Sequence, residues 1–431
     1  MQRLWLLIGG APTTREARFF SAAALIISML LTVTAIVADS RGIHFGSFRL
    51  GGDFAQFYAV GLTMKNFPHE QIYNPAFQNE LIRGFRPDTE GVLIFANAPF
   101  LALAFRLLAN LPYAWAYVAW AAVSITLYLA GLIIIWPSDP AFARFSKTAF
   151  LLAISFPAFL WECVVNGQLS CIGFFAFSAC IGLDRRRRDF AAGVALALCA
   201  YKPTFLLLSL PMALVSRRRR LLAGFAAGIC GLGLLSLCAV GLSGCLAWLD
   251  ILRTYARMTA GHGPLLRSFK YVDAGAFLRL LVGGHTAFRF TLQGAICAAG
   301  VVWLGRAWWR WREHGGPTDL LWAATLAWTL VLGPYVPIYD VTLIVLSAIL
   351  VGGALRQEQH LERFGVQMAL VYLGGWFTQP IAQAAHLQIL TPVLAEVGVF
   401  ALRLQTEIGT GLVLVPASSE RGPAMWERND G

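Results

Sequence analysis

The sequence predicts an all-α polytopic membrane protein that crosses the bilayer about twelve times. Of its 431 residues, 58% are hydrophobic and only 13% are charged, whereas about a quarter of the residues of a soluble domain are charged. The apolar residues fall in runs close to the ~20 residues that a spanning helix needs. The arginines, which leave a formal net charge of +11, fall in short loops between these runs. That pattern orients membrane proteins, so we expect no nucleic acid as a partner.

The first apolar run, Phe19 to Val37, is too long for a signal-peptide core and lacks a small-residue cleavage site. We therefore expect a retained first span. Three arginines at positions 3, 15 and 18 precede this run and predict a cytoplasmic N-terminus.

A long first external loop is then expected over about residues 39–112, where acidic and basic residues balance. Residues 92–111 are apolar but are interrupted by Asn97, Pro99 and Arg106. We expect this stretch to be a juxtamembrane helix in the interface.

The next spans alternate in direction, with the basic loops in the cytoplasm. They are expected at residues 114–135, 148–161, 169–183, 221–242, 287–304, 320–333, 341–355, 366–377 and 390–402. A small loop at 162–168 and a second polar external loop at about 243–286 are expected between them. Residues 1–403 would form one transmembrane domain, and residues 404–431 a cytoplasmic tail.

One apolar stretch, residues 190–215, lies between two runs of four arginines, Arg185–Arg188 and Arg217–Arg220. A single crossing would leave one run outside. The stretch is broken at Lys202 and Pro203, so we predict a two-legged hairpin that keeps both arginine runs in the cytoplasm.

Asp53 is the strongest candidate for chemistry, because it stands among glycines and aromatic residues in the first external loop. Apolar neighbours would raise the proton affinity of its carboxylate and make it a plausible general base. A solvated loop aspartate or a helix cap is the alternative.

Three other polar residues near the membrane each allow more than one interpretation. Glu162 is costly at that depth unless paired or functional, although it could snorkel to the interface. Lys202 would pair with a phosphate, or alternatively form a structural ion pair or reach the cytoplasmic surface. Asp340 would either shape the site or cap the helix after it.

The second external loop has an excess of basic residues, for which an anionic headgroup or phosphate is a reasonable partner, with ordinary solvated basic residues as the alternative. Its members are Arg253, Arg257, His262, Arg267 and Lys270. Among the eight cysteines, Cys163 and Cys171 flank a short loop, where two unpaired thiols are favoured over a disulfide. We expect no metal or cofactor, and no Walker motif is present.

Several short motifs, taken in order, resemble glycosyltransferase family 87, the polyprenyl-phosphate-sugar-dependent enzymes of the GT-C fold that include bacterial α-mannosyltransferases. The motifs are Gly51–Phe54, Phe57–Ala59, Ile72–Pro75, Asn97–Pro99, Asn166–Gln168, Ala192–Gly193, Ala200–Pro203, Pro334–Tyr335 and Tyr339–Asp340.

The resemblance implies that Asp53 is the catalytic carboxylate and that Glu162 fills the place of a second acid. Relatives often carry a histidine where this chain has Pro337 and Ile338. That departure leaves open any donor contact there and the identity of the sugar, a mannose-like hexose or similar.

The expected function is therefore inverting transfer of a sugar from a polyprenyl phosphate to a glycolipid or glycan hydroxyl, outside a bacterial inner membrane. Donor phosphate contacts are assigned to Lys202 and to the basic residues Arg253, Arg257, Arg267 and Lys270. Substrate contacts are assigned to Tyr58, Gln168, Tyr335, Asp340 and His262. The rival functions are a transporter or lipid flippase, since a broken hairpin resembles transport helices, and a surface-polysaccharide polymerase or ligase.

Overall fold

In the computed structural model, residues 14–40, 51–87, 93–143, 145–260, 267–283, 286–355 and 358–409 are described. Within these ranges the regular elements are all helices, and the single β-bridge joins Tyr271 to Pro337. The all-α class predicted from the sequence is confirmed.

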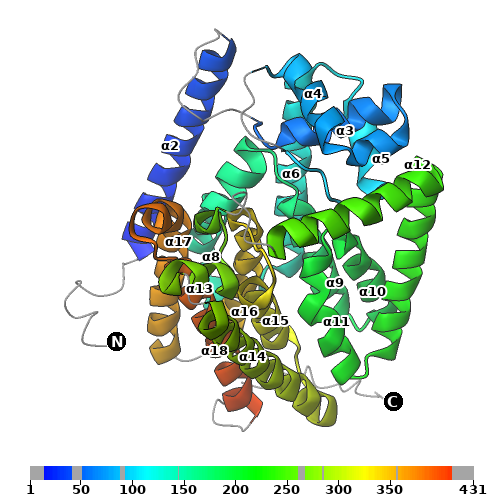
Figure 1. The fold of residues 1–431 in the computed structure, drawn as a ribbon. Coiled ribbons are helices and arrows are strands. Elements are labelled where there is room, and N and C mark those ends of the chain that lie inside the picture. Colours follow the sequence, from blue (N-terminus) through cyan, green and yellow to red (C-terminus); the bar gives the residue numbers. More distant parts are fainter. Residues whose placement is uncertain are drawn as a thin grey trace, which may run out of the picture.

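The first part of the chain forms a long helix, a group of short helices and then the first long span. These elements are α2 (Thr14–Ser40), α3 (Phe54–Asn66), η1 (His69–Tyr73), α4 (Pro75–Phe85), α5 (Phe100–Leu108) and α6 (Tyr113–Ile135). The helices α3, α4 and α5 gather at one end of the molecule, where α3 packs on α5 (Figure 1). Helices were expected in this segment, and α5 falls where an interfacial helix was predicted.

The middle of the chain contains the broken hairpin and the longest helix. Its elements are α7 (Pro140–Ala143), α8 (Ser146–Ile154), η2 (Ala158–Val165), α9 (Ser170–Arg185), α10 (Asp189–Ala197), η3 (Leu198–Tyr201), η4 (Pro203–Phe205), α11 (Leu206–Val215) and α12 (Arg219–Ala260). The predicted break at Lys202 is confirmed, because η3 ends before it and η4 begins after it.

The last part packs around a buried central helix. Its elements are η5 (Ser268–Lys270), α13 (Ala274–Val282), α14 (Thr286–His314), α15 (Asp319–Leu332), η6 (Ile338–Leu343), α16 (Ile344–Ala354), α17 (Glu358–Ala385) and α18 (Leu390–Gly409). Twelve consecutive residues of α15, from Leu320 to Val331, are buried, and α15 packs on both α16 and α18.

Four helical stretches in the described residues are long and apolar enough to cross a membrane. They are Tyr113–Ile135, Ser146–Val165, Arg219–Thr254 and Thr286–His314. Shorter apolar helices form the two legs of the expected hairpin, Asp189–Tyr201 and Pro203–Val215, and occupy two other expected spans, Asp319–Leu332 and Ile338–Ala354. The expected total of about twelve spans stays a prediction.

The prediction of a polar loop from residue 243 is wrong, because α12 continues to Ala260 with a kink at Gly241. Gly241 has φ of 71°, a conformation that glycine adopts at little cost. The segment after it mixes charged with apolar residues, and its Ile251 is buried while Arg253 is exposed. The charged residues therefore led us to predict a loop where the structure has an amphipathic helix.

Two further boundaries differ from expectation. Glu162 was placed in a loop but lies in η2, which resumes the helix after Pro157. The tail was expected from residue 404, but α18 runs on to Gly409, and residues 410–431 lie outside the described ranges. Cys163 and Cys171 are buried free thiols, as favoured.

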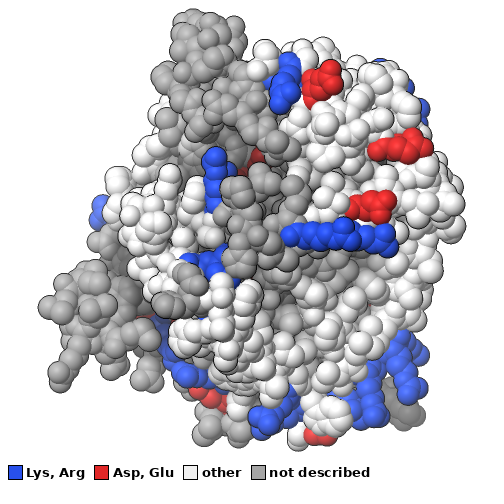
Figure 2. All heavy atoms as spheres, viewed as in Figure 1, with Lys and Arg blue, Asp and Glu red and all other residues white. Residues whose placement is uncertain are grey.

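Both runs of four arginines lie at the same end, as the hairpin predicted. Arg218 forms an ion pair with Asp184 at the end of α9. Figure 2 shows Lys and Arg side chains gathered along the lower edge of the view, whereas α3 to α5 lie at the upper edge in Figure 1.

Candidate active site

Asp53 immediately precedes α3, at the end of the molecule where α6 begins. Its backbone N–H and that of Phe54 both donate to the carbonyl oxygen of Asn166, at 3.1 and 3.0 Å. Its carboxylate makes no capping hydrogen bond to α3. The alternative of a helix-capping aspartate is therefore wrong, and the side chain is left for another role.

The carboxylate of Asp53 accepts a hydrogen bond from the Gln168 amide, with Nε2 2.6 Å from Oδ2. Burial raises the pKa of the Asp53 carboxyl above its ordinary value, while the Gln168 hydrogen bond and the charge of Lys270 offset part of the rise. The group is thus a carboxyl with increased proton affinity, the property that a general base needs.

Helix α6 positions both segments that meet at Asp53. The Tyr113 hydroxyl donates to the Gly51 carbonyl at 2.7 Å, and the Tyr117 hydroxyl donates to the Val164 carbonyl at 2.9 Å. The Trp120 ring N–H donates to the Gly167 carbonyl at 2.9 Å. Three side chains of one helix therefore fix Asp53 relative to Gln168.

Gly167 allows the close approach of these segments. It has φ of 79°, and a Cβ there would lie 2.6 Å from the Cβ of Phe54. Both the backbone conformation and the contact require glycine. The motif of Asn166, Gly167 and Gln168 is thus explained by packing as well as by the Asp53 contact.

Glu162 lies one helical turn before this motif and accepts a hydrogen bond from the Asn166 amide at 3.0 Å. It is close enough to Asp53 for the two carboxyl groups to interact electrostatically, and Lys270 acts on both of them. The structure therefore brings together both acids that the sequence singled out, with Lys270 acting on both.

A second polar cluster lies beside the first. The Lys202 ammonium forms an ion pair with the Asp340 carboxylate, whose other oxygen accepts a hydrogen bond from the Ser170 hydroxyl at 2.9 Å. Asp340 is 1% exposed and does not cap the following helix, so that alternative is wrong. The structural ion pair considered for Lys202 is present.

One short segment connects the two clusters. Gln168 contacts Asp53 and Ser170 contacts Asp340, and the carbonyl between them, from Leu169, accepts the Tyr201 hydroxyl at 3.3 Å. Lys202 also lies 4.6 Å from the ring centre of Tyr339. The Tyr-Lys-Pro and Tyr-Asp motifs thus meet at this segment.

Lys270 reaches the site because its segment is bonded to the proline-tyrosine motif. Val272 N–H donates to the Val336 carbonyl at 2.8 Å, and Val336 N–H donates to the Asp273 carboxylate at 3.0 Å. Asp273 also caps α13, and burial raises the pKa of its carboxyl. Tyr335, at φ of 53°, stacks beside the Arg279 guanidinium.

Other predicted residues are not brought to Asp53. Tyr58 is buried, and its hydroxyl donates to the Leu111 carbonyl at 2.8 Å. Arg253 is exposed and pairs with Asp250, and Arg257 and Arg267 are exposed. His262 lies outside the described residues.

Sequence reasoning missed Ser170, Asp273 and Arg279. Ser170 stands two residues after Gln168, at the start of the next span, which was the available signal. The contacts of Asp273 and Arg279 depend on long-range packing against residues 335–336, which local spacing does not reveal. Within the described residues, no group of three or more His, Cys, Asp or Glu side chains is suited to hold a metal ion.

The model of glycosyltransferase family 87 matches residues 95–336, more than half of the chain. The match includes Glu162, Gln168, Lys202, Lys270 and Tyr335, whereas Asp53 lies outside it. No curated protein and no solved structure matches the sequence. The family match agrees with the ordered motifs and with the apolar helices, and on this ground the chain belongs to glycosyltransferase family 87, a family of membrane glycosyltransferases.

Proposed function

We propose that this glycosyltransferase takes its sugar from a polyprenyl-phosphate donor and attaches it to a glycolipid or glycan hydroxyl, with Asp53 as general base. The observation that carries the proposal is the partly buried Asp53 carboxylate, held by a neutral amide and with a raised pKa. A base of this kind is better matched to neutral pH than an ordinary aspartate is.

In the proposed step, the acceptor hydroxyl oxygen attacks the anomeric carbon of the donor sugar. Asp53 takes the proton from that hydroxyl as the new glycosidic bond forms. The bond between the anomeric carbon and the phosphate oxygen breaks, and its electron pair leaves with the polyprenyl phosphate. Attack from the face opposite the leaving group inverts the anomeric centre.

The leaving phosphate gains negative charge, which nearby cations must stabilise. Lys270 is our first candidate, since it is exposed and acts electrostatically on both Asp53 and Glu162. Lys202 is the second, and it would have to exchange its Asp340 partner for the phosphate. Arg253 and Arg257 are retained as contacts for the lipid surface only, because Arg253 already pairs with Asp250.

The sidedness that we propose for the site rests on the positions of the arginines. The Arg218 and Arg185 loops lie at one end of α6, and Asp53 lies at the other. If the arginine-rich end is cytoplasmic, as the positive-inside rule predicts, Asp53 faces the outside of the bacterial inner membrane. Transporter and flippase functions are less favoured, because the family is one of glycosyltransferases.

The test uses the purified protein in liposomes with radiolabelled polyprenyl-phosphate sugars and a membrane lipid extract. Wild type is compared with Asp53→Asn, which keeps the size of the side chain but cannot accept the proton. The matched control is Asp250→Asn, because Asp250 is an exposed aspartate on the same chain. We expect transfer by wild type and control and almost none by Asp53→Asn.

Two outcomes would contradict the proposal. Equal transfer by Asp53→Asn would remove Asp53 from the chemistry. Absence of transfer from every polyprenyl-phosphate sugar, with transfer from a nucleotide sugar instead, would overturn the donor class.

A further inference from the structure

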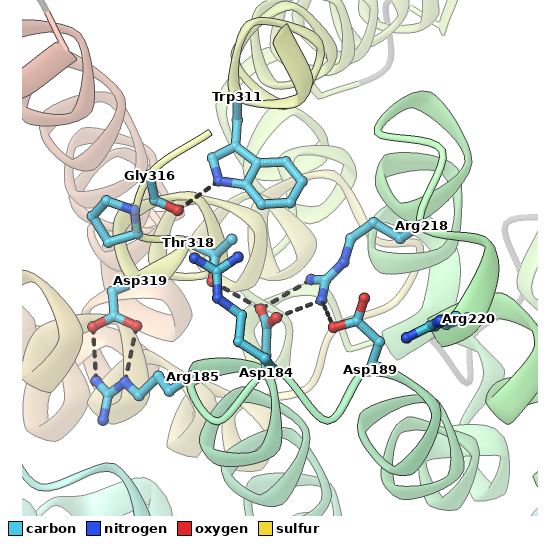
Figure 3. Close-up of a pocket in the computed structure, with 11 residues that line it drawn as sticks. Asp184, Arg185, Asp189, Arg218, Arg220, Trp311, Gly316, Thr318 and Asp319 are labelled. Carbon is cyan, nitrogen blue, oxygen red and sulfur yellow. Dashed lines mark hydrogen bonds and ion pairs between the residues drawn. The ribbon is translucent and has the colours of Figure 1, made fainter. Parts of the chain in front are cut away.

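A polar cavity of about 640 Å³ lies at the arginine-rich end of the molecule. Its wall comes from the loops before α10 and α12, from the end of α14 and from the start of α15 (Figure 3). Four arginines and three aspartates line it, together with Trp311 and Thr318. None of these residues belongs to the candidate active site.

The aspartates of this cavity are already satisfied. Asp184 accepts hydrogen bonds from Arg218, from the Thr318 hydroxyl at 2.8 Å and from the Trp322 ring N–H at 2.8 Å. Asp319 accepts two hydrogen bonds from Arg185, at 2.9 and 3.0 Å. Asp189 shares Arg218 with Asp184, at 2.9 Å. Each carboxylate of the cavity is thus paired with an arginine, and the four lining arginines outnumber the three aspartates, so the cavity is better suited to an anion than to a cation.

Positive donors remain available. Arg187 and Arg220 line the cavity, are exposed and form no ion pair with any described residue. Arg218 is 5% exposed at its side chain, and its Nε has no hydrogen-bond partner among the described residues. Figure 3 shows the Arg218 guanidinium between Trp311 and the two aspartates Asp184 and Asp189.

Arg187 has an unusual backbone conformation, which is fixed by hydrogen bonds at the end of α9. It follows the C-cap of α9, Arg186, and has φ of 58°. Its N–H donates to the Asp184 carbonyl at 2.8 Å, and that of Arg188 donates to the Leu183 carbonyl at 2.9 Å. This is the helix-ending motif in which glycine is the preferred residue. An arginine is disfavoured relative to glycine in this conformation, and Arg187 lines the cavity.

We propose that this cavity binds a phosphate-bearing anion through the guanidinium groups of Arg187 and Arg220, next to the buried, positively charged Arg218. Planar guanidinium groups match phosphate oxygens in pairs of hydrogen bonds, and a half-enclosed site strengthens such bonds. The phosphate comes either from an anionic phospholipid headgroup or from a soluble phosphorylated molecule, which share this chemistry.

The position of the cavity is compatible with both sources. Phe190 and Leu214, which belong to the helices bearing the two loops, are 52% and 61% exposed and present apolar surface at this end. A lipid headgroup in the cavity would keep its chains along that surface. The cavity also opens beside loops that the arginine pattern predicts to face the cytoplasm, where soluble phosphates are abundant.

The test measures anion binding and not sugar transfer, so it is independent of the proposed function. The full chain is reconstituted in nanodiscs of phosphatidylcholine, and its unfolding temperature is followed by intrinsic fluorescence. One arm adds pyrophosphate at constant ionic strength. The other arm replaces part of the phosphatidylcholine by phosphatidylglycerol.

Two double variants separate the cavity from the surrounding charge. Arg187→Gln with Arg220→Gln removes the two lining arginines. Arg186→Gln with Arg219→Gln removes two charges from the same loops, at exposed arginines that do not line the cavity. Glutamine takes the backbone conformation of position 187 at no greater cost than arginine, so folding is retained.

We expect wild type and the 186/219 control to be stabilised by one of the two anions with similar apparent affinity. The 187/220 variant should bind about a hundredfold more weakly, since each hydrogen bond to a charged group contributes about tenfold or more. Stabilisation by pyrophosphate identifies a soluble ligand, and stabilisation only by phosphatidylglycerol identifies a lipid. Equal weakening in both double variants, or stabilisation by neither anion, would overturn the proposal.

Discussion

The two ends of α6 contact two polar regions, and the carboxylates in these regions have different kinds of partner. At its first residue, the Tyr113 hydroxyl holds the loop of Asp53, whose carboxylate is bonded by the neutral amide of Gln168. At its last residue, the Ile135 carbonyl accepts a hydrogen bond from Arg185, in the network where Asp184 is bonded by Arg218.

The contrast teaches how to tell a reactive carboxylate from a structural one. A carboxylate paired with a guanidinium is fixed in its ionised form, and breaking a buried pair costs much stability. A carboxyl group whose pKa is raised by burial, and whose hydrogen-bond partner is uncharged, can exchange its proton. Substitutions at the two ends should therefore affect different properties.

The largest effect is expected from Asp53→Asn, which should lower transfer by about 10²- to 10⁴-fold, the usual contribution of a general base. Its stability should be unchanged or increased near neutral pH, because burial of the ionised Asp53 opposes folding above its ordinary pKa. Initial transfer rates and the thermal unfolding midpoint in detergent measure the two quantities. A strongly destabilised Asp53→Asn protein would indicate that Asp53, like Asp184, has a structural role.

Asp184→Ala should show the opposite pattern. It leaves Arg218 without its main partner in a buried site, which costs about 3–5 kcal/mol. We expect a lower unfolding temperature and a lower yield, with near-normal transfer per folded molecule at low temperature. Asp319→Ala is a milder control, because the Arg185 pair is about 30% exposed. A normal unfolding temperature for Asp184→Ala would contradict the structural reading.

Asp273→Ala removes the acceptor of two backbone N–H groups, those of Ala276 and Val336. The expected loss of stability is about 2 kcal/mol, from one helix cap and one buried hydrogen bond. Because this bond ties the Lys270 segment to Tyr335, transfer should also fall. Asp273→Asn keeps one acceptor oxygen and should recover part of the stability and part of the transfer rate. Equal losses in Asp273→Ala and Asp273→Asn would contradict the role given to these hydrogen bonds.

The smallest change is expected from Gln168→Leu, and it is best seen in the pH profile. Transfer requires ionised Asp53, so the rate rises with pH through the pKa of that carboxyl. The Gln168 hydrogen bond lowers this pKa, and its removal should move the acid limb to higher pH. Rates measured across the acid limb test this, with Gln71→Leu as a control, because the Gln71 amide contacts Asn74 and not Asp53. An unmoved limb would show that another group sets the profile.

Much of the fold was predictable because apolar runs and basic loops are local signals. The span at 114–135 agrees with α6 to within one residue at its start, and the hairpin break at Lys202 was found from a single Lys-Pro pair. The helix from 243 to 260 was missed because charged residues on its exposed side hid the buried Ile251. Pattern reasoning fails where one face of a helix is polar.

The acidic residues of the site could be predicted from the sequence, but the pairs that the site residues form could not. Asp53 and Glu162 stand out as carboxylates in apolar surroundings, which one sequence reveals. The pairs of Asp53 with Gln168 and of Lys202 with Asp340 join residues more than a hundred positions apart. Such pairs depend on how the helices pack, so the sequence offered several basic candidates, of which Lys270 alone acts on Asp53 among the described residues.

The length of α6 has a consequence for the lipid around the protein. Its 23 residues measure roughly 34 Å, close to the hydrocarbon thickness of a bilayer. A thinner membrane would be accommodated by tilting this helix, and its hydroxyl and carbonyl contacts would then shift at both extremities together. The acyl-chain length of the surrounding membrane should therefore affect the position of Asp53, the proposed base.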